Sequence, residues 1–545
     1  MRSTFFGIEM GRRAVVAQQA ALDVTGHNVS NSNTTGYTRQ VAEMTATDPF
    51  TYPAKTMPIS AGQMGTGSVV ADVRRLRDEF VDAQMLDENH RNGYWNGLQD
   101  SLSKIEGVLN EPTDTGLRGV LDEFWKSWQT LSESPESEAV RATVLENGQA
   151  VVDTIHHMYN QLTDLKNDLN NEVKVKVDDI NSLGVQIKDL NIQIQSITVS
   201  GQRPNDLLDK RQVLIEELSN LVNTEVKNEA NGMVTVLVGG TALVDGISSN
   251  KLAVIPDRNQ MYEVVWDLPR TGNRINSTIL GDVTIGDTRY PEVNLTSGEL
   301  VGIINARGPA ENTHLGNVNY LSAEHTGIVP GLMDNLNLVA ETIVSKFNEQ
   351  HKKGYALTTG EVSDINGIVT DCPTGKTGLA FFKEYPASTI TDDWEWAKHI
   401  EISAEIQSNV NNIAAASKAT YKEVPAGSGN YTREEFGDGG NAISLAQLKQ
   451  DSSFINGTTT LDDYWRAKVS TIGVISEESQ RMIENQEMLI NELENKRQQV
   501  SGVSLDEEMT NMIKFQHAYN AAARFITATD EALDKIINGM GLVGR

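Results

Sequence analysis

Apolar residues recur every seven positions at both ends of the chain. The stripe near the C-terminus consists of Leu505, Met512, Tyr519, Ile526, Leu533 and Met540, and three further members, Met509, Ala523 and Ile537, each follow one of these by four positions. The stripe near the N-terminus consists of Ile8, Val15, Leu22 and Val29. A seven-residue repeat keeps one apolar face of a helix turned toward a partner helix. Both ends are therefore predicted to be coiled-coil helices.

Both stripes are narrow, because alanine and polar side chains such as Gln18, Gln19, Gln516 and Asn520 flank them. An isolated helix with so narrow a stripe would bury too little apolar surface to be stable. Each stripe therefore needs a partner, and the pattern leaves two possibilities open. The terminal helices could close one globular core within the chain. Alternatively, they could pair with each other and with neighbouring subunits.

The segments between the two ends alternate between helical and strand-like patterns. Helical spacing predicts helices at 80–109, 117–128, 139–198, 207–221, 332–351 and 469–500. The helix at 139–198 would be a rod roughly 90 Å long. Gly93 and Gly97 are expected to weaken the middle of the first of these helices. Residues 40–75 read as an extended arm with short strands, and β-branched runs such as 233–238 and 263–266 predict a β-rich segment.

The predicted fold class is multidomain α+β, with discontinuous helical coiled-coil and bundle domains formed by the N- and C-terminal segments and β-rich outer domains inserted in the middle. Four domains are expected. They are a terminal coiled-coil domain of 1–40 plus 503–545, a long-helix bundle domain of 41–223 plus 325–356 and 466–502, a β-rich outer domain of 224–324, and a second mixed outer domain of 357–465.

An acidic cluster precedes the last helix. Ser504 and Glu507 have the spacing of a capping box, and Asp506 and Glu508 lie near the positive end of the helix dipole. A helix cap explains this cluster better than a catalytic carboxylate pair.

The charge of the chain argues against two classes of partner. Its 545 residues include 46 Lys and Arg and 74 Asp and Glu, which gives a net charge of −28. Such a chain would repel nucleic acid and anionic membrane surfaces. A single cysteine, Cys372, excludes an internal disulfide. The pattern shows neither a signal peptide nor a membrane-spanning stretch, so neither Sec export nor membrane insertion is expected.

No motif supports catalysis, a metal or another cofactor. The stretch Gly375-Lys376-Thr377 lacks the earlier glycine of a P-loop, and the adjacent His156 and His157 point in different directions on a helix. An enzyme inserted at 357–465 would have few candidate residues. They are Asp392, Asp393, Glu395 and His399, which read as a solvated helix start.

Several stretches carry a resemblance to a known family. The stretches Asn28-Val29-Ser30-Asn31 and Thr34-Thr35-Gly36-Tyr37-Thr38-Arg39 resemble the N-terminal signature of flagellar rod, hook and hook-associated axial proteins. The signature positions in this chain are Asn28, Asn31, Thr34, Gly36, Tyr37 and Arg39. Residues 5–9, 206–211, 348–355, 501–508 and 515–524 resemble the hook-associated protein 1 family, whose members form the proximal hook-filament junction. Over the outer middle domains the resemblance is weak.

The resemblance implies a structural, non-enzymatic subunit of the bacterial flagellum, needed for filament assembly and located outside the cell at the junction between hook and filament. It implies residence in the cytoplasm before export through the flagellar type III apparatus, and a cytoplasmic export chaperone that docks on the C-terminal stripe. The other implied partners are the hook protein, the second (distal) junction protein and neighbouring copies in a ring.

The terminal stripes would stay mobile in the monomer and become ordered on assembly. Two alternatives remain open: a flagellin-like or hook-like protein that polymerises by itself, and an axial protein that carries an enzyme at 357–465.

Overall fold

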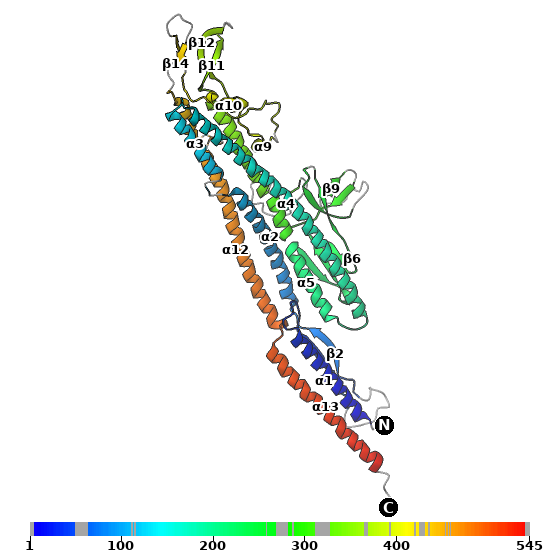
Figure 1. Cartoon of the computed structure of the whole chain (residues 1–545). Helices are drawn as coiled ribbons and strands as arrows, with labels where there is room; N and C mark the ends of the chain where they lie inside the picture. Colours follow the sequence, from blue (N-terminus) through cyan, green and yellow to red (C-terminus); the bar gives the residue numbers. More distant parts are fainter. Residues whose placement is uncertain are drawn as a thin grey trace, which may run out of the picture.

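The computed structural model shows an elongated molecule with both chain termini at one end (Figure 1). The structure describes residues 5–539 except for 50–63, 111–112, 114–115, 258, 269–281, 286–287, 311–326, 364–368, 392–393, 419–420, 424–430, 434–436, 453, 456 and 458. In these ranges, no helix combines the length and apolar character needed to cross a membrane.

The end that holds both termini consists of two helices and a hairpin. Helix α1 (Phe6–Ser30) packs along α13 (Leu505–Gly539), and the antiparallel strands β1 (Gln40–Ala46) and β2 (Ser68–Arg75) lie against α1 (Figure 1). We call α1 and α13 the terminal pair. The two predicted terminal helices and the short strands of the predicted arm are confirmed, whereas residues 50–63 of the arm lie outside the described residues.

Long helices form the middle of the molecule, which we call the rod. They are α2 (Glu79–Leu109), α3 (Leu117–Glu133), α4 (Glu138–Val199), α5 (Asn205–Leu221) and α12 (Leu461–Ser501). Helix α4 has 62 residues and corresponds to the long helix predicted at 139–198. Its heptad residues Val173, Ile180, Ile187 and Ile194 are completely buried. Helix α12 begins eight positions before the predicted start, because Thr460 caps it and Trp465 anchors its first turns in the core.

Helix α6 (Glu299–Arg307) packs against α2, although it lies in the range predicted as β-rich. The close contact depends on glycine. A Cβ at Gly97 would come within 2.6 Å of the Glu299 carbonyl oxygen, and one at Gly93 within 1.9 Å of the Asn220 carbonyl oxygen. The expectation that these glycines only weaken α2 is therefore incomplete, since they let neighbouring backbones approach closely.

Antiparallel strands cover one side of the rod. The four-stranded sheet consists of β3 (Thr224–Asn228), β4 (Val234–Val238), β5 (Thr241–Asp245) and β6 (Ser248–Ser249), with the 3-10 turn η1 (Ala230–Gly232) between β3 and β4. Two hairpins follow: β7 (Leu252–Pro256) with β8 (Tyr262–Trp266), and β9 (Asp282–Ile285) with β10 (Thr288–Pro291). The predicted strands at 233–238 and 263–266 are confirmed.

The end opposite the termini is mixed and turn-rich. The predicted helix at 332–351 is continuous but contains a π-turn: α7 (Ile328–Thr342), η2 (Ile343–Phe347) and α8 (Asn348–His351). The remaining strands are β11 (Tyr355–Ser363), β12 (Val369–Thr377), β13 (Tyr421–Glu423) and β14 (Tyr431–Arg433). The remaining helices and 3-10 turns are α9 (Trp396–His399), α10 (Ala404–Ser408), η3 (Val410–Asn412), α11 (Gly440–Gln447) and η4 (Leu448–Gln450).

The fold class is confirmed: the N- and C-terminal segments are helical and lie together at one end, and the region between them in sequence contains β-structure (Figure 1). The proposed division into four domains stays a prediction.

Candidate assembly site at the terminal pair

The seven-residue stripe of α13 faces α1. Leu533 is buried between the helices, and Met512, Tyr519 and Ile526 are partly buried. Leu505, at the first position of the helix, is 52 % exposed, and Met540 lies outside the described residues. Four of the six predicted residues are therefore at least partly buried, and Ile526 lies against Gly11 of α1.

The α1 side of this contact depends on small residues. A Cβ at Gly11 would come within 2.5 Å of Ile526, and one at Gly7 within 2.7 Å of Thr529, so the two backbones approach closely at these points. The predicted stripe residues Ile8, Val15, Leu22 and Val29 are all partly buried. The fully buried positions of α1 are Gly11, Ala17, Ala21, Thr25 and Asn28. A search for large apolar residues misses such a contact, whereas a search for small residues three or four positions apart would have found most of it.

A short apolar stripe at the start of α13 is exposed to solvent. It consists of Leu505, Met509 and Ile513, which are four positions apart and so lie along one side of the helix. We call it the outer stripe. Phe525, Ile536 and Ile537 of α13 and Val16 of α1 are also exposed but lie on other sides of the two helices or further along them. Met509 and Ile537 were expected to support the seam with a partner helix, but within this chain they are exposed. A single chain therefore buries only part of the apolar surface that its terminal helices carry.

The family signature lies where the terminal pair meets the rod. Asn28, at the end of α1, is 1 % exposed, and its side chain makes four hydrogen bonds. Its Nδ2 donates to the Gln40 carbonyl oxygen at 2.8 Å and to Glu508 Oε2 at 3.1 Å. Its Oδ1 accepts from the Tyr37 hydroxyl at 2.7 Å and from the Gln40 backbone N–H at 3.0 Å. Asn28 thus ties the end of α1 to the start of β1 and to α13.

Arg39 links the same region to the start of α13. Its Nε donates to Glu508 Oε1 at 2.8 Å, and its Nη2 lies 2.9 Å from Glu507 Oε1. Its backbone N–H donates to the carbonyl oxygen of Ser501, the last residue of α12. Because Glu508 is almost completely buried, this ion pair is shielded from solvent on one side. The acidic cluster therefore does more than cap α13, although the predicted cap contact from Ser504 Oγ to the Glu507 N–H is present at 3.5 Å.

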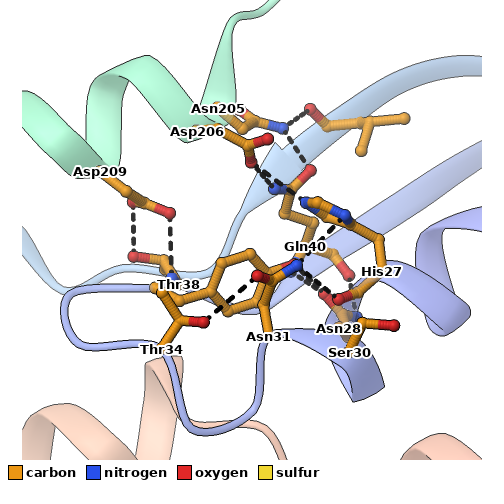
Figure 2. A network of polar contacts seen from close by, with 12 residues as sticks. His27, Asn28, Ser30, Asn31, Thr34, Thr38, Gln40, Asn205, Asp206 and Asp209 are labelled. Carbon is orange, nitrogen blue, oxygen red and sulfur yellow. Dashed lines mark hydrogen bonds and ion pairs between the residues drawn. The ribbon is translucent and has the colours of Figure 1, made fainter.

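The first turns of α5 hold the other side of the signature (Figure 2). Thr38 donates to Asp209 through its backbone N–H at 3.0 Å and through its hydroxyl at 2.7 Å, and Arg75 Nη1 lies 2.6 Å from Asp209 Oδ1. Gln40 Nε2 donates to Asp206 at 2.9 Å, while Asn205 Nδ2 donates to Gln40 Oε1 at 3.1 Å.

Figure 2 shows these contacts meeting between the signature loop and α5. Residues 206–211 resembled the family in sequence, but only the structure shows that they bind the signature.

The remaining signature residues shape the loop itself. Asn31 Nδ2 donates to the His27 carbonyl oxygen at 3.0 Å, and the Thr34 hydroxyl donates to Asn31 Oδ1 at 3.2 Å. Gly36 has a φ of +75°, and a Cβ there would come within 2.2 Å of Val213 on α5. Burial raises the pKa of the Tyr37 hydroxyl, with the nearby carboxylates of Asp206, Asp209 and Glu508 adding to this effect. Tyr37 therefore stays protonated and donates to Asn28.

We call the contacts of Asn28, Thr38, Arg39 and Gln40 with α5 and α13 the joint. Hydrogen bonds are directional, so the joint fixes the orientation of the terminal pair on the rod. A cavity of about 310 Å³ lies beside it, lined by the signature loop, α5 and the end of α12. The arrangement therefore holds the terminal pair at a defined angle to the rod.

The residues proposed for an inserted enzyme do not form a catalytic cluster in the described part of the chain. Glu395 forms an ion pair with Lys398 at 2.9 Å, and the His399 ring stacks on Trp394 with centroids 4.4 Å apart. Asp392 and Asp393 lie outside the described residues. Among the residues that are described, no group of three His, Cys, Asp or Glu side chains could hold a metal. Gly375-Lys376-Thr377 belongs to strand β12 and does not precede a helix, as a P-loop would.

Comparison with known proteins places these features in one family. A family model described as flagellar hook-associated protein FlgK helical domain matches residues 102–365. A model of the flagella basal body rod protein matches residues 8–38, and one of the flagellar basal body rod FlgEFG protein C-terminal region matches residues 495–539. The last two matches cover most of α1 and all of α13, together with the Asn28–Glu508 contact of the joint.

Full-length relatives have similar sequences. Flagellar hook-associated protein 1 of Bacillus subtilis (strain 168) is 37% identical over 557 residues, covering 100% of both chains. The protein of the same name from Escherichia coli (strain K12) is 25% identical over 576 residues, covering 96% of this chain and 97% of the relative.

A solved structure of the flagellar hook junction protein FlgK from Burkholderia pseudomallei matches the fold with a TM-score of 0.55 and 17% identity, covering 77% of this chain and 100% of that chain.

Proposed function

The chain belongs to the flagellar hook-associated protein 1 family, and from this premise we propose how it acts as a structural subunit of the junction between hook and filament. In the proposed mechanism, the terminal pair is the part of the subunit that enters the axial assembly. The outer stripe then packs against neighbouring copies, which form a ring. A self-polymerising flagellin-like or hook-like protein is not favoured.

The observation that carries this proposal is the outer stripe. Six large apolar side chains of α13 remain exposed on a helix that is already paired with α1, and three of them, Leu505, Met509 and Ile513, lie in a row. Single exposed apolar residues are normal, but a row of them along one helix marks an interaction surface. Burying this row against further helices would complete the seams that the seven-residue repeat predicts.

The proposed partners follow from the position of such a subunit. The hook protein would lie on one side of the ring and the distal junction protein on the other. Before assembly, the chain would reside in the cytoplasm and leave through the flagellar type III apparatus. In the cytoplasm, an export chaperone would cover the C-terminal stripe and prevent premature contacts between copies of the chain. We further propose that the protein has no enzymatic activity.

The pairing of α1 with α13 also changes the proposal that the terminal helices fold only on assembly. Because α1 and α13 pair within one chain, assembly would order the pair further rather than create it. Hydrogen exchange on the purified monomer measures this directly. Fast exchange at 6–30 and 505–539 beside a protected rod supports ordering on assembly, whereas full protection at both ends contradicts it.

Substitutions on α13 test the assembly surface. Ile513→Lys places a charge on the outer stripe, and Leu533→Lys places one inside the pair. Both variants should keep a folded rod and lose incorporation into flagella, observed as a loss of filaments and motility. Val474→Lys, at an exposed position of α12, is the matched control and should assemble normally.

Measuring the amount of subunit released into the medium separates failed export from failed incorporation. Normal filaments built with Ile513→Lys would contradict the role of the outer stripe.

A further inference from the structure

A cavity of about 600 Å³ lies between α2, α5 and β3, on the rod side of the joint. Its lining includes five cationic side chains: Arg75, Arg77, Arg203, Arg211 and Lys227. Three of these arginines have a carboxylate partner within the chain. The pairs are Arg75 with Asp209 at 2.6 Å, Arg77 with Asp82 at 2.6 Å and Arg203 with Asp72 at 3.0 Å. The other two cations, Arg211 and Lys227, form no ion pair with any residue that the structure describes.

Arg211 is the unusual member, because its side chain is only 7 % exposed. Its Nη1 donates to Asn191 Oδ1 and to the Gly232 carbonyl oxygen, each at 2.8 Å. Its Nε and Nη2 make no hydrogen bond to the described residues. The guanidinium is thus anchored by neutral oxygens on one side, and its remaining donors have no partner in the chain.

The electrostatic surroundings of Arg211 favour an anion. Burial lowers the pKa of Arg211 to about 10, and repulsion from Arg75 and Arg77 adds to this effect, so the side chain still carries its charge at neutral pH. A buried charge without a counter-ion is strongly destabilising, and an anion in the cavity would relieve both the burial and the repulsion.

Four carboxylates also line the cavity and oppose an anion. They belong to Glu79, Asp82, Asp87 and Glu225. Asp82 is buried, and its charge is balanced by the ion pair with Arg77. The other three residues are exposed to solvent, where water and salt screen their charges. Arg211 is buried, so its attraction for an anion is screened much less.

We propose that this cavity is a binding site for a phosphate-class oxyanion. A guanidinium presents its N–H donors as a fork that matches two oxygens of a phosphate, and the unused Nε and Nη2 of Arg211 supply such a fork. Lys227 provides the second unpaired positive charge, so the two cations match the two negative charges of a phosphate dianion. The cavity is large enough to admit either the free ion or a phosphate group on a small molecule.

The test is calorimetric titration of the full-length protein with inorganic phosphate, at an ionic strength held constant with sodium chloride. We expect saturable binding that Arg211→Gln weakens by about tenfold or more, the effect of losing a charge-assisted hydrogen-bond pair. Lys227→Gln should weaken it by about threefold. Lys174→Gln, which removes an exposed lysine of α4 outside the cavity, is the control and should bind as the unmodified protein does.

The outcomes separate the possibilities. A parallel titration with glycerol phosphate shows whether the site prefers the free ion or a phosphate ester. If Arg211→Gln does not fold, Arg211→Lys and Lys227→Gln decide the matter, since the first keeps the charge but loses the fork and the second alters only an exposed side chain. An absence of saturable binding, or equal weakening by Lys174→Gln, overturns the proposal.

Discussion

The core at the far end of the rod and the joint at the terminal pair are both buried, but the core consists of apolar side chains and the joint of polar ones. Around Phe347, which is fully buried, the core packs aromatic rings against each other. These rings belong to Phe124, Trp128, Phe381 and Phe382, with centroids 5.3 to 5.6 Å from that of Phe347. The joint instead buries Asn28 and Glu508, which satisfy each other and their neighbours by hydrogen bonds.

The difference separates stability from orientation. Apolar packing contributes free energy in proportion to buried area and has little directional preference. A hydrogen bond contributes little net free energy, but it requires a defined geometry. The rod is therefore held together by its core, whereas the joint determines the angle at which the terminal pair leaves the rod.

The comparison would break if the aromatic core did not dominate the stability of the rod. Phe347→Ala should lower the free energy of unfolding of the rod by about 4 kcal/mol, because it removes a large buried ring and leaves a cavity. Denaturant unfolding followed by tryptophan fluorescence measures the change. Phe80→Ala, at an exposed position of α2, is the matched control and should change stability by less than about 0.5 kcal/mol.

A second prediction uses His351, which lies fully buried in the same core. Its Nδ1–H donates to the Leu379 carbonyl oxygen at 2.8 Å, and its Nε2 accepts from the Ala414 N–H at 3.0 Å, so the ring is neutral. Burial lowers its pKa to about 4, with Arg141 adding to the effect. Between pH 6.5 and 4, the unfolded chain therefore binds a proton that the folded chain does not, and stability falls as the pH falls.

The expected loss from this single group is about 3 kcal/mol across that interval. Urea unfolding at a series of pH values measures it, with His351→Gln lacking this part of the slope. His157→Gln, at an exposed position, is the control and should retain the slope. Identical pH profiles for the unmodified protein and His351→Gln would contradict the assignment of a neutral ring.

The third prediction concerns the joint, where the expected change is local. Arg39→Gln leaves the buried Glu508 carboxylate without its cationic partner and should destabilise the joint by about 2 kcal/mol. Faster hydrogen exchange at residues 38–40 and 505–510, with unchanged exchange in α4, is the expected result. Arg12→Gln removes an exposed ion pair with Glu9, is the matched control, and should leave the exchange at residues 38–40 and 505–510 unchanged. A loss of protection throughout the rod would show that the joint is part of the core after all.

The sequence predicted the helices well because their patterns are long and regular. The repeat along α4 and the Ser504 cap of α13 are local signals, and both are present in the structure, although the Glu507 carboxylate binds Arg39. The joint could not be predicted in this way. Asn28 and Glu508 are 480 positions apart, and the local pattern around either residue does not indicate that the two are in contact. The close contact at Gly11 was missed for a related reason, since a glycine carries no apolar signal although it allows helices to approach.

The pairing of α1 with α13 also sets an order of events during synthesis. Helix α1 is made first, and its partner α13 follows the rod in the sequence. Helix α1 therefore stays unpaired until α13 has been translated. Contacts between such distant positions form late, and the rod shortens the search by bringing α2 and α12 side by side. A chain still on the ribosome, or truncated before α13, would thus present α1 without its partner, and closure of the terminal pair would require α13 to have been made.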